Sequence, residues 1–458
     1  MKTAPLVKRA LSDPIAWLIK PLECLNQVSG VVSVNEFISH AKQLAVLLPS
    51  NRHAINLCDN RYLFMLGLCA SIIRGQTNLL PSNKNLATQE QLNNRYDGCY
   101  IIHDGVVETP DIEQLNIALC SFTATDQRQD IPEIDLEHIA VISFTSGSTG
   151  EAKPNIKTWK TLVDSTAINS RYMLPDQQQT FYHLAAVPGQ HMWGFETSVL
   201  MAMFANVCTA DARPLYPDDM REMLEKLPQP RTLIGTPLHL RAINSSQLRI
   251  PELVSVLSAT APLSQQLAEE VEVKFQTEVR EVYGCSEVGS MAIRRTAKSE
   301  LWEKFDGLNF TSDEQGSIIV NADHLPQQIL LEDNLEMIDT SHFKLAGRSS
   351  DQIKIAGKRG SLDEVNKALM TFPKLEDGIV FFPPQEKSVP RLVALVVVRG
   401  ELNKVELRKH MQKYLDTAFV PRPIIQVPQL PRAESGKLIK TELIRFYQNQ
   451  VKLTRSYR

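Results

Sequence analysis

Residues 143–154 of the chain read SFTSGSTGEAKP. An apolar, β-branched run at 139–142 precedes this stretch, and a helix-compatible segment begins at Thr158. Glycines and hydroxyl side chains follow each other closely, so the backbone can turn its N–H groups inward beside hydroxyl donors, which suits a polyphosphate. The pattern predicts a strand that runs into a phosphate-binding loop, formed by Thr145, Ser146, Gly147, Ser148, Thr149 and Gly150, with Lys153 placed to meet anionic oxygens.

This stretch has two other interpretations. A flexible Ser/Gly linker is the plainer interpretation of such a run. The strand before the run and the Lys-Pro pair after it favour the phosphate loop instead. A Walker-type phosphotransferase is disfavoured because the glycines are not followed by the GK[ST] ending of that loop.

Length and composition limit the class of protein. A chain of 458 residues exceeds one ordinary core and suits a large domain plus a smaller one. Hydrophobic residues at 43% and charged residues at 22% are typical of a globular enzyme. The net charge of -3 argues against a nucleic-acid partner. Residues 391–458 nevertheless carry 14 Lys or Arg against 5 Asp or Glu, which indicates either a site for a phosphorylated or acidic partner or a solvated basic face.

The cysteines and the apolar segments bear on location. Seven cysteines are scattered without CxxC spacing, which fits reduced thiols in the cytoplasm. The N-terminal segment lacks the apolar core of a signal peptide, and the longest apolar stretch, 63–73, is too short to span a bilayer. We therefore expect a cytoplasmic protein without a membrane span.

Hydrophobic periodicity predicts the fold class. Helices are expected at 34–48, 63–73, 195–204 and 263–275, and strands at 54–58, 100–103, 183–187, 231–235, 253–257 and 279–283. Residues 104–138 are polar and are expected to form a surface connection. Alternating strands and helices predict an α/β domain of helix-flanked parallel sheets, with ligands at the carboxyl ends of the strands.

The pattern changes near Gly347. Shorter strands are expected at 352–355, 378–382 and 392–398, with helices at 362–370 and 405–415, and the basic tail at 451–458 is expected to be loose. The sequence thus predicts a large N-terminal domain, 1–347, and a small α+β C-terminal domain, 348–458.

Four motifs together resemble those of one family. TSGSTGEAKP at 145–154 is similar to the phosphate loop of the adenylate-forming superfamily, which includes acyl-CoA and aryl-CoA synthetases, adenylation domains of peptide synthetases and firefly luciferase. YGCSE at 283–287, GRSSDQIKIAGKR at 347–359 and PRAESGK at 431–437 resemble further motifs of this family, in the expected order. The resemblance covers roughly residues 34–445 and implies that the small domain is mobile.

The resemblance implies roles for residues of the large domain. Ser286 stands where Thr is usual and keeps the hydroxyl that would contact the α-phosphate, while Glu287 would help to hold Mg²⁺ on ATP. A lone surface carboxylate is the alternative for Glu287. Further implied contacts are Ala259, Thr260, Ala261 and Tyr283 with the nucleotide, and His191, Trp193 and Gly284 with the acid. A histidine satisfied within the core is the alternative for His191, and the bulk of Trp193 favours small or medium acids.

The resemblance also implies roles for Asp339, near the end of the large domain, and for residues of the small domain. Asp339 would bind the ribose hydroxyls, although the usual Thr-Gly before it is replaced by Met-Ile, and Arg348 would contact ribose or phosphate. Ser350 would be the interdomain hinge. Gly357 would let a pantetheine thiol pass, with a plain turn glycine as the alternative. Lys437 would bridge the substrate carboxylate and the α-phosphate.

The activity implied is that of an ATP-dependent acid–thiol ligase. Such an enzyme activates an aryl or short to medium acyl acid as acyl-AMP, then transfers it to the thiol of coenzyme A or of the phosphopantetheine on an acyl carrier protein. The short chain and the KRGSLDEV passage at 358–365 are similar to stand-alone ligases of aryl-polyene and related pathways. The alternative is a degenerate relative that binds nucleotide or acyl ligand without turnover.

Overall fold

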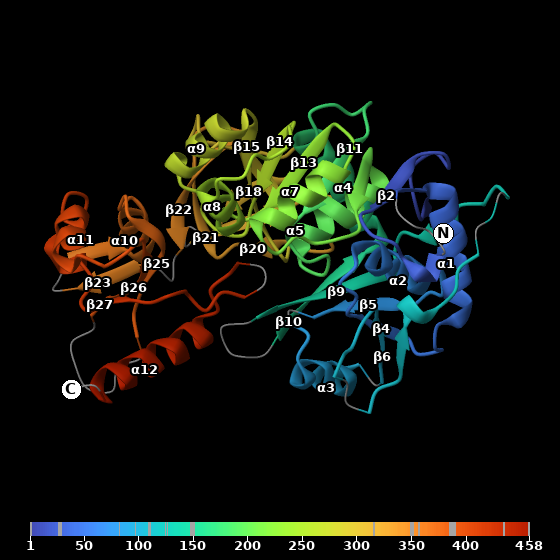
Figure 1. Cartoon of the computed structure of the whole chain (residues 1–458), viewed down its shortest axis with the longest axis horizontal. Helices are drawn as coiled ribbons and strands as arrows, with labels where there is room; N and C mark the ends of the chain where they lie inside the picture. Colours follow the sequence, from blue (N-terminus) through green and yellow to red (C-terminus); the bar gives the residue numbers. More distant parts are fainter. Residues whose placement is uncertain are drawn as a thin grey trace. The chain divides into compact units, whose positions relative to one another are not determined.

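The computed structural model describes residues 2–25, 30–81, 83–96, 98–108, 111–123, 125, 127–146, 152–314, 317–348, 352–355, 358–383, 391–433 and 436–456. The chain divides into two compact units (Figure 1). The first comprises Met1–Ser299, Glu303–Leu308 and Ala322–Gln327, and the second comprises Glu300–Trp302, Asn309–Asn321 and Gln328–Arg458. A functional boundary at residue 347 stays a prediction.

The larger sheet of the first unit has the strand order β17–β16–β15–β14–β13–β11–β12–β2–β3. The strands from β15 to β2 in this order are parallel, as the alternation of strands and helices predicts. Their bounds are β2 (Pro14–Leu18), β3 (Gly30–Ser33), β11 (Phe181–Ala185), β12 (Val207–Ala210), β13 (Arg231–Gly235), β14 (Ser255–Ser258), β15 (Glu278–Cys285), β16 (Gly289–Arg294) and β17 (Trp302–Lys304).

The second sheet of this unit has the order β10–β9–β5–β4–β6–β7. Its bounds are β4 (His53–Asn56), β5 (Thr77–Leu80), β6 (Tyr100–His103), β7 (Gln114–Asn116), β9 (Ile139–Ser146) and β10 (Ala152–Thr158). The predicted strand at 139–142 is confirmed within β9. The strand β10 was not expected: it lies between the loop and the helix-compatible segment that begins at Thr158, as an antiparallel edge strand beside β9. Its proline and charged residues give little strand signal, and an edge position tolerates them.

Helices cover these sheets (Figure 1). The predicted helices are confirmed as α1 (Val34–Leu47), α2 (Arg61–Ile73), a continuous helix made of α5 (Met192–Phe195), the π-helical turn Glu196–Leu200 and α6 (Met201–Phe204), and α9 (Gln265–Phe275). Further helices are α3 (Leu86–Arg95), α4 (Trp159–Met173), α7 (Pro217–Lys226) and α8 (Pro237–Ser245). Of these, α4 confirms the helix-compatible segment after Thr158, whereas α3, α7 and α8 were not expected.

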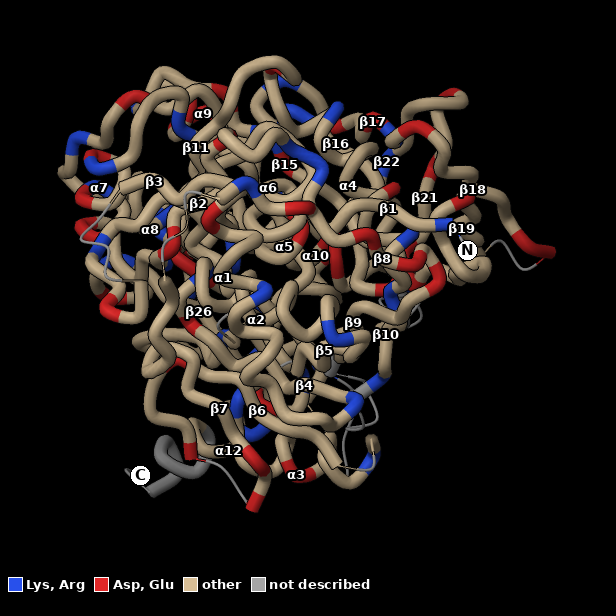
Figure 2. Tube along the Cα trace, turned by 90° about the vertical axis from the view of Figure 1, so that its right-hand side faces the viewer, with Lys and Arg blue, Asp and Glu red and all other residues tan. Residues whose placement is uncertain are grey.

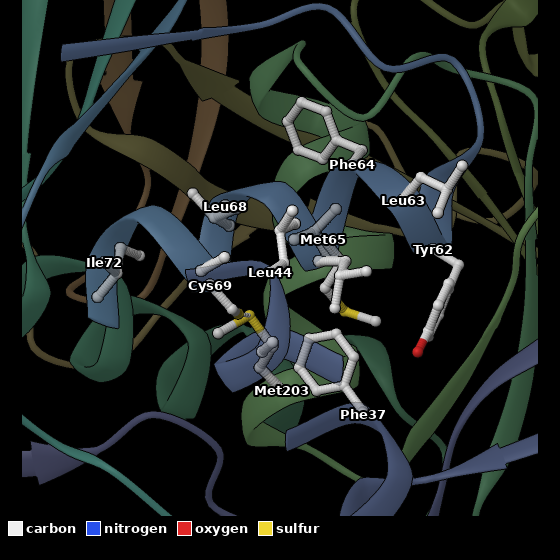
Figure 3. Close-up of a cluster of buried hydrophobic side chains, with 14 of the residues drawn as sticks. Phe37, Leu44, Tyr62, Leu63, Phe64, Met65, Leu68, Cys69, Ile72 and Met203 are labelled. Carbon is white, nitrogen blue, oxygen red and sulfur yellow. Dashed lines mark hydrogen bonds between the residues drawn. The ribbon is translucent and has the colours of Figure 1, made fainter. Parts of the chain in front are cut away.

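The core of the first unit lies around α2. Figure 3 shows this helix with Phe37 and Leu44 of α1 and Met203 of α6 against its side chains. Nearly every residue of α2 is buried, which explains its apolar composition all round the helix. Asn60 accepts the Leu63 N–H at 3.1 Å and thereby fixes where the helix begins.

The polar segment 104–138 is more ordered than expected. It contains β7 and β8 (Glu133–Asp135), and β8 pairs with β1 (Thr3–Pro5). The predicted surface connection thus includes two short strands that were not expected. These strands are three residues long, and the partner of β8 lies about 130 residues away in sequence, so local composition carries no signal for them.

The second unit is α+β. Its strands are β18 (Asn309–Ser312), β19 (Ile318–Asn321), β20 (Ile329–Leu330), β21 (Asp333–Met337), β22 (His342–Arg348), β23 (Gln352–Ile355), β24 (Lys358–Ser361), β25 (Leu375–Phe381), β26 (Val393–Val398) and β27 (Ile424–Gln426). Its helices are α10 (Leu362–Met370), α11 (Lys404–Met411) and α12 (Lys440–Ser456). The predicted strands and helices of this region are confirmed, and with them the fold class.

The C-terminal tail differs from the prediction. Helix α12 includes residues 451–456, so the expectation of a loose tail is wrong for them. Leu443, Phe446 and Tyr447 of α12 pack against a cluster that contains Phe381 and Val393. These packed apolar residues stabilise the first turns of α12, and residues 451–456 extend the helix from there.

Two general properties complete the description. Acidic and basic residues are interspersed along the trace of the first unit (Figure 2). Among the described helices, none combines the length and hydropathy that crossing a bilayer requires.

Candidate active site

The loops predicted to bind nucleotide and acid follow neighbouring parallel strands. Residues 188–194 follow β11, residues 258–263 follow β14, and the YGCSE motif ends β15, while β13 lies between β11 and β14. The carboxyl ends of parallel strands meet at one edge of a sheet. The structure therefore brings these three segments to the same edge, together with Gly235 at the end of β13.

The YGCSE motif forms a tight turn between β15 and β16. A Cβ at Gly284 would lie 2.4 Å from the Gly289 carbonyl oxygen, so the two strands approach closely only because residue 284 is glycine. Ser286 and Glu287 are half-buried in this turn. Burial, with the nearby Glu287 carboxylate as a second cause, raises the pKa of the Cys285 thiol to about 12, so this thiol stays neutral beside the carboxylate.

A buried pair of charges lies against this turn. Lys157 of β10 and Glu196 of the π-helical turn are 2% and 4% exposed. The Lys157 Nζ donates to the Glu287 carbonyl oxygen at 2.6 Å, and the Glu196 carboxylate accepts from Ser290 Oγ at 2.6 Å. Burial lowers the pKa of Lys157 and raises the pKa of Glu196, and the attraction between the two charges opposes both shifts.

The SATAPL loop has an unusual backbone. Thr260 has φ +79°, which β-branched residues rarely adopt and which costs about 1–3 kcal/mol. Ala259 is buried, and Thr260 and Ala261 are half-buried. The Glu281 carboxylate, 3% exposed, holds the loop by accepting the Leu263 N–H at 2.8 Å. Strain that the surrounding structure imposes is typical of a ligand-binding loop.

The PGQHMWG loop is fixed from two sides. Trp193 is buried, and its Nε1 donates to the Gly235 carbonyl oxygen at 2.9 Å. The buried Arg61 donates from one guanidinium nitrogen to the carbonyl oxygens of Ala185 and Val187, at 3.2 and 2.7 Å. His191 is half-buried at the start of α5, and its contact with a substrate stays a prediction.

The PRAESGK loop of the second unit has an anchored base and an exposed lysine. The Arg432 guanidinium binds both carboxylate oxygens of Asp377 at 2.6 and 2.7 Å, and it also donates to the Gly436 carbonyl oxygen. The Ala433 N–H donates to the backbone oxygen of Lys437 at 2.9 Å. The Lys437 side chain is exposed on this turn. The described residues on either side of positions 434–435 are thus held by hydrogen bonds, and the Lys437 side chain lies at the surface.

Asp339 has a structural task in the turn between β21 and β22. Its Oδ1 accepts the N–H groups of Ser341 and His342, both at 2.7 Å, and these bonds, that of Ser341 foremost, lower the pKa of the exposed carboxyl. A role with ribose stays a prediction. Arg348 ends β22, where its backbone is in register with Asp333.

Several predicted residues lie outside the part of the chain that the structure describes. These are Gly147, Ser148, Thr149, Gly150, Ser350 and Gly357. Of the remaining phosphate-loop residues, Thr145 and Ser146 end β9 in register with Lys153 and Ala152 of β10. Lys153 is exposed.

Sequence reasoning missed Lys157, Glu196 and Arg61. Only Glu196 gives a signal, since it is the single charged residue in the apolar helical run 192–204. Such a residue is expected to be paired when buried. A shallow hollow of about 410 Å³ lies elsewhere, beside the amino ends of β14 and β15, and its lining includes none of the predicted residues.

Known proteins resemble this chain along most of its length. It is 23% identical over 447 residues to a 2-succinylbenzoate–CoA ligase of Staphylococcus epidermidis, covering 90% of this chain and 92% of that protein. It is 21% identical over 356 residues to a 3,4-dihydroxybenzoate–[aryl-carrier protein] ligase of Bacillus anthracis, covering 74% and 82%.

Solved structures show the same fold. ATP-bound MatB from Rhodopseudomonas palustris matches with a TM-score of 0.78 at 17% identity, covering 96% of this chain and 97% of that one. The O-succinylbenzoate coenzyme A synthetase MenE of Bacillus subtilis, in complex with AMP, matches with a TM-score of 0.75 at 18% identity, covering 94% and 95%.

Two family models match in the order that the motifs predict. The model of the AMP-binding enzyme C-terminal domain matches residues 364–437, which end at Lys437. The model of the AMP-binding enzyme itself matches residues 49–318, more than half of the chain, and the chain therefore belongs to the AMP-binding enzyme family.

Proposed function

We propose that this protein joins a carboxylic acid to AMP at the carboxyl edge of the larger sheet and then passes the acyl group to a thiol. The observation that carries the proposal is that the PGQHMWG, SATAPL and YGCSE segments meet at one sheet edge. The strained Thr260 in the second segment supports ligand binding there. Membership of the AMP-binding enzyme family supports AMP as the nucleotide to which the acid is joined.

In the first half-reaction, a carboxylate oxygen of the acid attacks the α-phosphorus of ATP. A phosphorus–oxygen bond forms as the bond to the leaving pyrophosphate breaks, which gives acyl-AMP. Positioning and electrostatic stabilisation supply most of the rate in such a transfer. Lys437 would offset the negative charge that develops between the carboxylate and the α-phosphate, and the Ser286 hydroxyl would donate to an α-phosphate oxygen.

The donor set fits Mg²⁺. Glu287 offers carboxylate oxygens on a turn whose backbone is held, and Mg²⁺ uses only one or two protein carboxylates beside phosphate oxygens and water. The ion, when bound, would neutralise phosphate charge. Glu287 would orient it, and the neutral Cys285 thiol beside Glu287 adds no competing charge.

In the second half-reaction, a thiol attacks the acyl carbon, and AMP and the thiol proton are released. We propose coenzyme A or the phosphopantetheine of an acyl carrier protein as the thiol. The two relatives named above are ligases for one acceptor of each kind. The basic C-terminal segment suits either, because one acceptor carries phosphate and the other is usually acidic.

For the acid we propose an aryl or short to medium acyl substrate, since the bulky, buried Trp193 belongs to the PGQHMWG loop that would border the acid. The seven cysteines are all free thiols, which supports a cytoplasmic location.

The direct test of the proposed function is pyrophosphate release with a panel of aryl and fatty acids, with coenzyme A and a carrier protein as acceptors. Failure of every acid to release pyrophosphate would contradict the proposal.

The Glu287→Gln variant tests the metal site. Removing the carboxylate charge while keeping its shape is expected to raise the Mg²⁺ concentration for half-maximal pyrophosphate release about tenfold, equivalent to about 1.4 kcal/mol. The measurement is a Mg²⁺ titration at saturating acid and ATP. Glu269→Gln, which changes an exposed carboxylate on α9, is the matched control. An unchanged titration curve for Glu287→Gln would remove this residue from the metal site.

A further inference from the structure

Lys157 and Glu196 are a pair of opposite charges buried near each other, and this burial calls for a physical reason. Both side chains are almost fully buried, and removing two charges from water costs several kcal/mol per ion before their attraction repays it. Apolar side chains of similar volume often give equal or greater stability. A gain in the stability of the whole fold is therefore a poor explanation for burying these two charges. Their contacts indicate a role in holding the neighbouring turn.

Lys157 and Glu196 form hydrogen bonds with the backbone and side chains of the YGCSE turn and of Ser290, which follows it. On one side, Lys157 donates to the carbonyl oxygen of Glu287 itself, at 2.6 Å. On the other side, the Glu196 carboxylate accepts both the N–H and the hydroxyl of Ser290, at 3.2 and 2.6 Å. A Cβ at Gly289, where φ is +100°, would lie 2.4 Å from the Glu196 carboxylate, so this contact depends on glycine. The backbone is thus held before and after Gly289.

Lys157 also connects two separate parts of the first unit. It lies on β10, which is in register with β9 from Ala152 to Thr158, and β10 follows the predicted phosphate-binding segment in sequence. Glu196 lies on the helix that begins at the PGQHMWG loop. The pair therefore joins the β9–β10 hairpin and this helix to the turn that carries Ser286 and Glu287.

We propose that Lys157 and Glu196 are positioning residues that hold the Ser286–Glu287 turn in the geometry that magnesium–nucleotide binding requires. This inference rests on the proposed function. Neither side chain contacts the reacting groups in it, since Lys157 acts through a backbone oxygen and Glu196 acts through Ser290. The loss of either contact frees the backbone on one side of the metal-binding carboxylate.

Lys157→Met tests the proposal, because methionine keeps an unbranched apolar stem and removes the ammonium donor. We expect calorimetry to show ATP binding in the presence of Mg²⁺ weakened about 10- to 100-fold, the range typical of residues that orient a metal ligand. ATP binding in EDTA should stay within about twofold of wild type. Thioester formation from a supplied acyl-adenylate, which needs no metal–nucleotide complex, should also be preserved.

Arg9→Met is the matched control. Arg9 is another buried cation that donates to backbone carbonyl oxygens, those of Ala202 and Val207, and among the described residues its hydrogen bonds go to these partners rather than to the YGCSE turn. The Arg9→Met substitution should lower the melting temperature without changing the ratio of the ATP affinities measured with and without Mg²⁺. Ser290→Ala removes only the hydroxyl that Glu196 accepts, so it gives a milder test should Lys157→Met fail to fold.

An unchanged Mg²⁺ ratio in both Lys157→Met and Ser290→Ala would overturn the inference. A ratio that falls equally in Arg9→Met would overturn it too, since the effect would then report general loosening of the fold. Failure of the proposed function is a separate result: wild-type protein would release no pyrophosphate with any acid. The calorimetric comparison of ATP with and without Mg²⁺ would still report on the turn.

Discussion

Replacement of Lys437 by alanine is expected to lower acid-dependent ATP–pyrophosphate exchange about 100- to 1000-fold, the cost of losing one preorganised donor to a developing charge. Thioester formation from a supplied acyl-adenylate should be largely spared, because no new charge develops at the α-phosphate in that step. The loop should keep its shape, since Arg432 anchors it through Asp377 and the Gly436 carbonyl oxygen. Exchange of labelled pyrophosphate measures the first step, and thioester formation measures the second.

Lys440→Ala provides the control. Lys440 is an exposed lysine three residues further along, at the start of α12, so its loss changes the net charge equally. Both half-reactions should be near wild type in this variant. An equal loss of both half-reactions in Lys437→Ala would contradict the role assigned to this lysine, because a general defect in folding or nucleotide binding would explain it better.

The fold could be predicted where local patterns determine the structure. The apolar run at Tyr100–His103 and the capped, buried helix α2 carry their signals within a few residues. β10 and β8 could not be predicted in this way. β8 forms because the distant strand β1 supplies its hydrogen bonds, and β10 forms because it pairs with the preceding strand β9 in a hairpin. In both strands this pairing overrides a weak local propensity.

The candidate site likewise contains residues that could be predicted from the sequence and residues that could not. Glu287, Trp193 and Lys437 were predicted because each lies in a short motif that resembles one of the family, and such a motif is contained within a few positions of the chain. The residues that hold the motifs in place were missed. Lys157 meets Glu287 across 130 positions, and Arg61 meets the Val187 carbonyl oxygen across 126, so no spacing along the chain reveals either contact.

The buried Glu196 shows what a sequence can still indicate. It is the single carboxylate in the run 192–204, whose other residues are apolar, small or hydroxyl-bearing. The cost of burying a charge without a partner implies that a donor must come from elsewhere in the fold. Here the donors include the Ser290 N–H and hydroxyl and the Asn169 side chain, with Lys157 as the nearby opposite charge. The residue type can be predicted to need a partner, but the partner's identity requires the tertiary structure.

Gly194→Ala is expected to damage both stability and acid binding. A Cβ at this position would lie 2.1 Å from the Pro188 carbonyl oxygen, and no side-chain rotation can relieve a clash with backbone. Overpacking of this kind costs about 1–3 kcal/mol, and we place this case at the upper end, which is about a 100-fold fall in the folding equilibrium constant. Because the helix must move away from the PGQHMWG loop, Trp193 should lose its bond to the Gly235 carbonyl oxygen.

The acid should therefore bind more weakly, while ATP affinity should change little, since the segments assigned to the nucleotide do not include residue 194. Denaturant unfolding measures the first effect, and half-saturating concentrations of acid and ATP in pyrophosphate release measure the second. Gly105→Ala makes the same chemical change where a Cβ would meet nothing within 4 Å, and it should behave as wild type. If Gly194→Ala matched this control in stability and acid affinity, the loop would not be held by the close approach of residue 194 to Pro188.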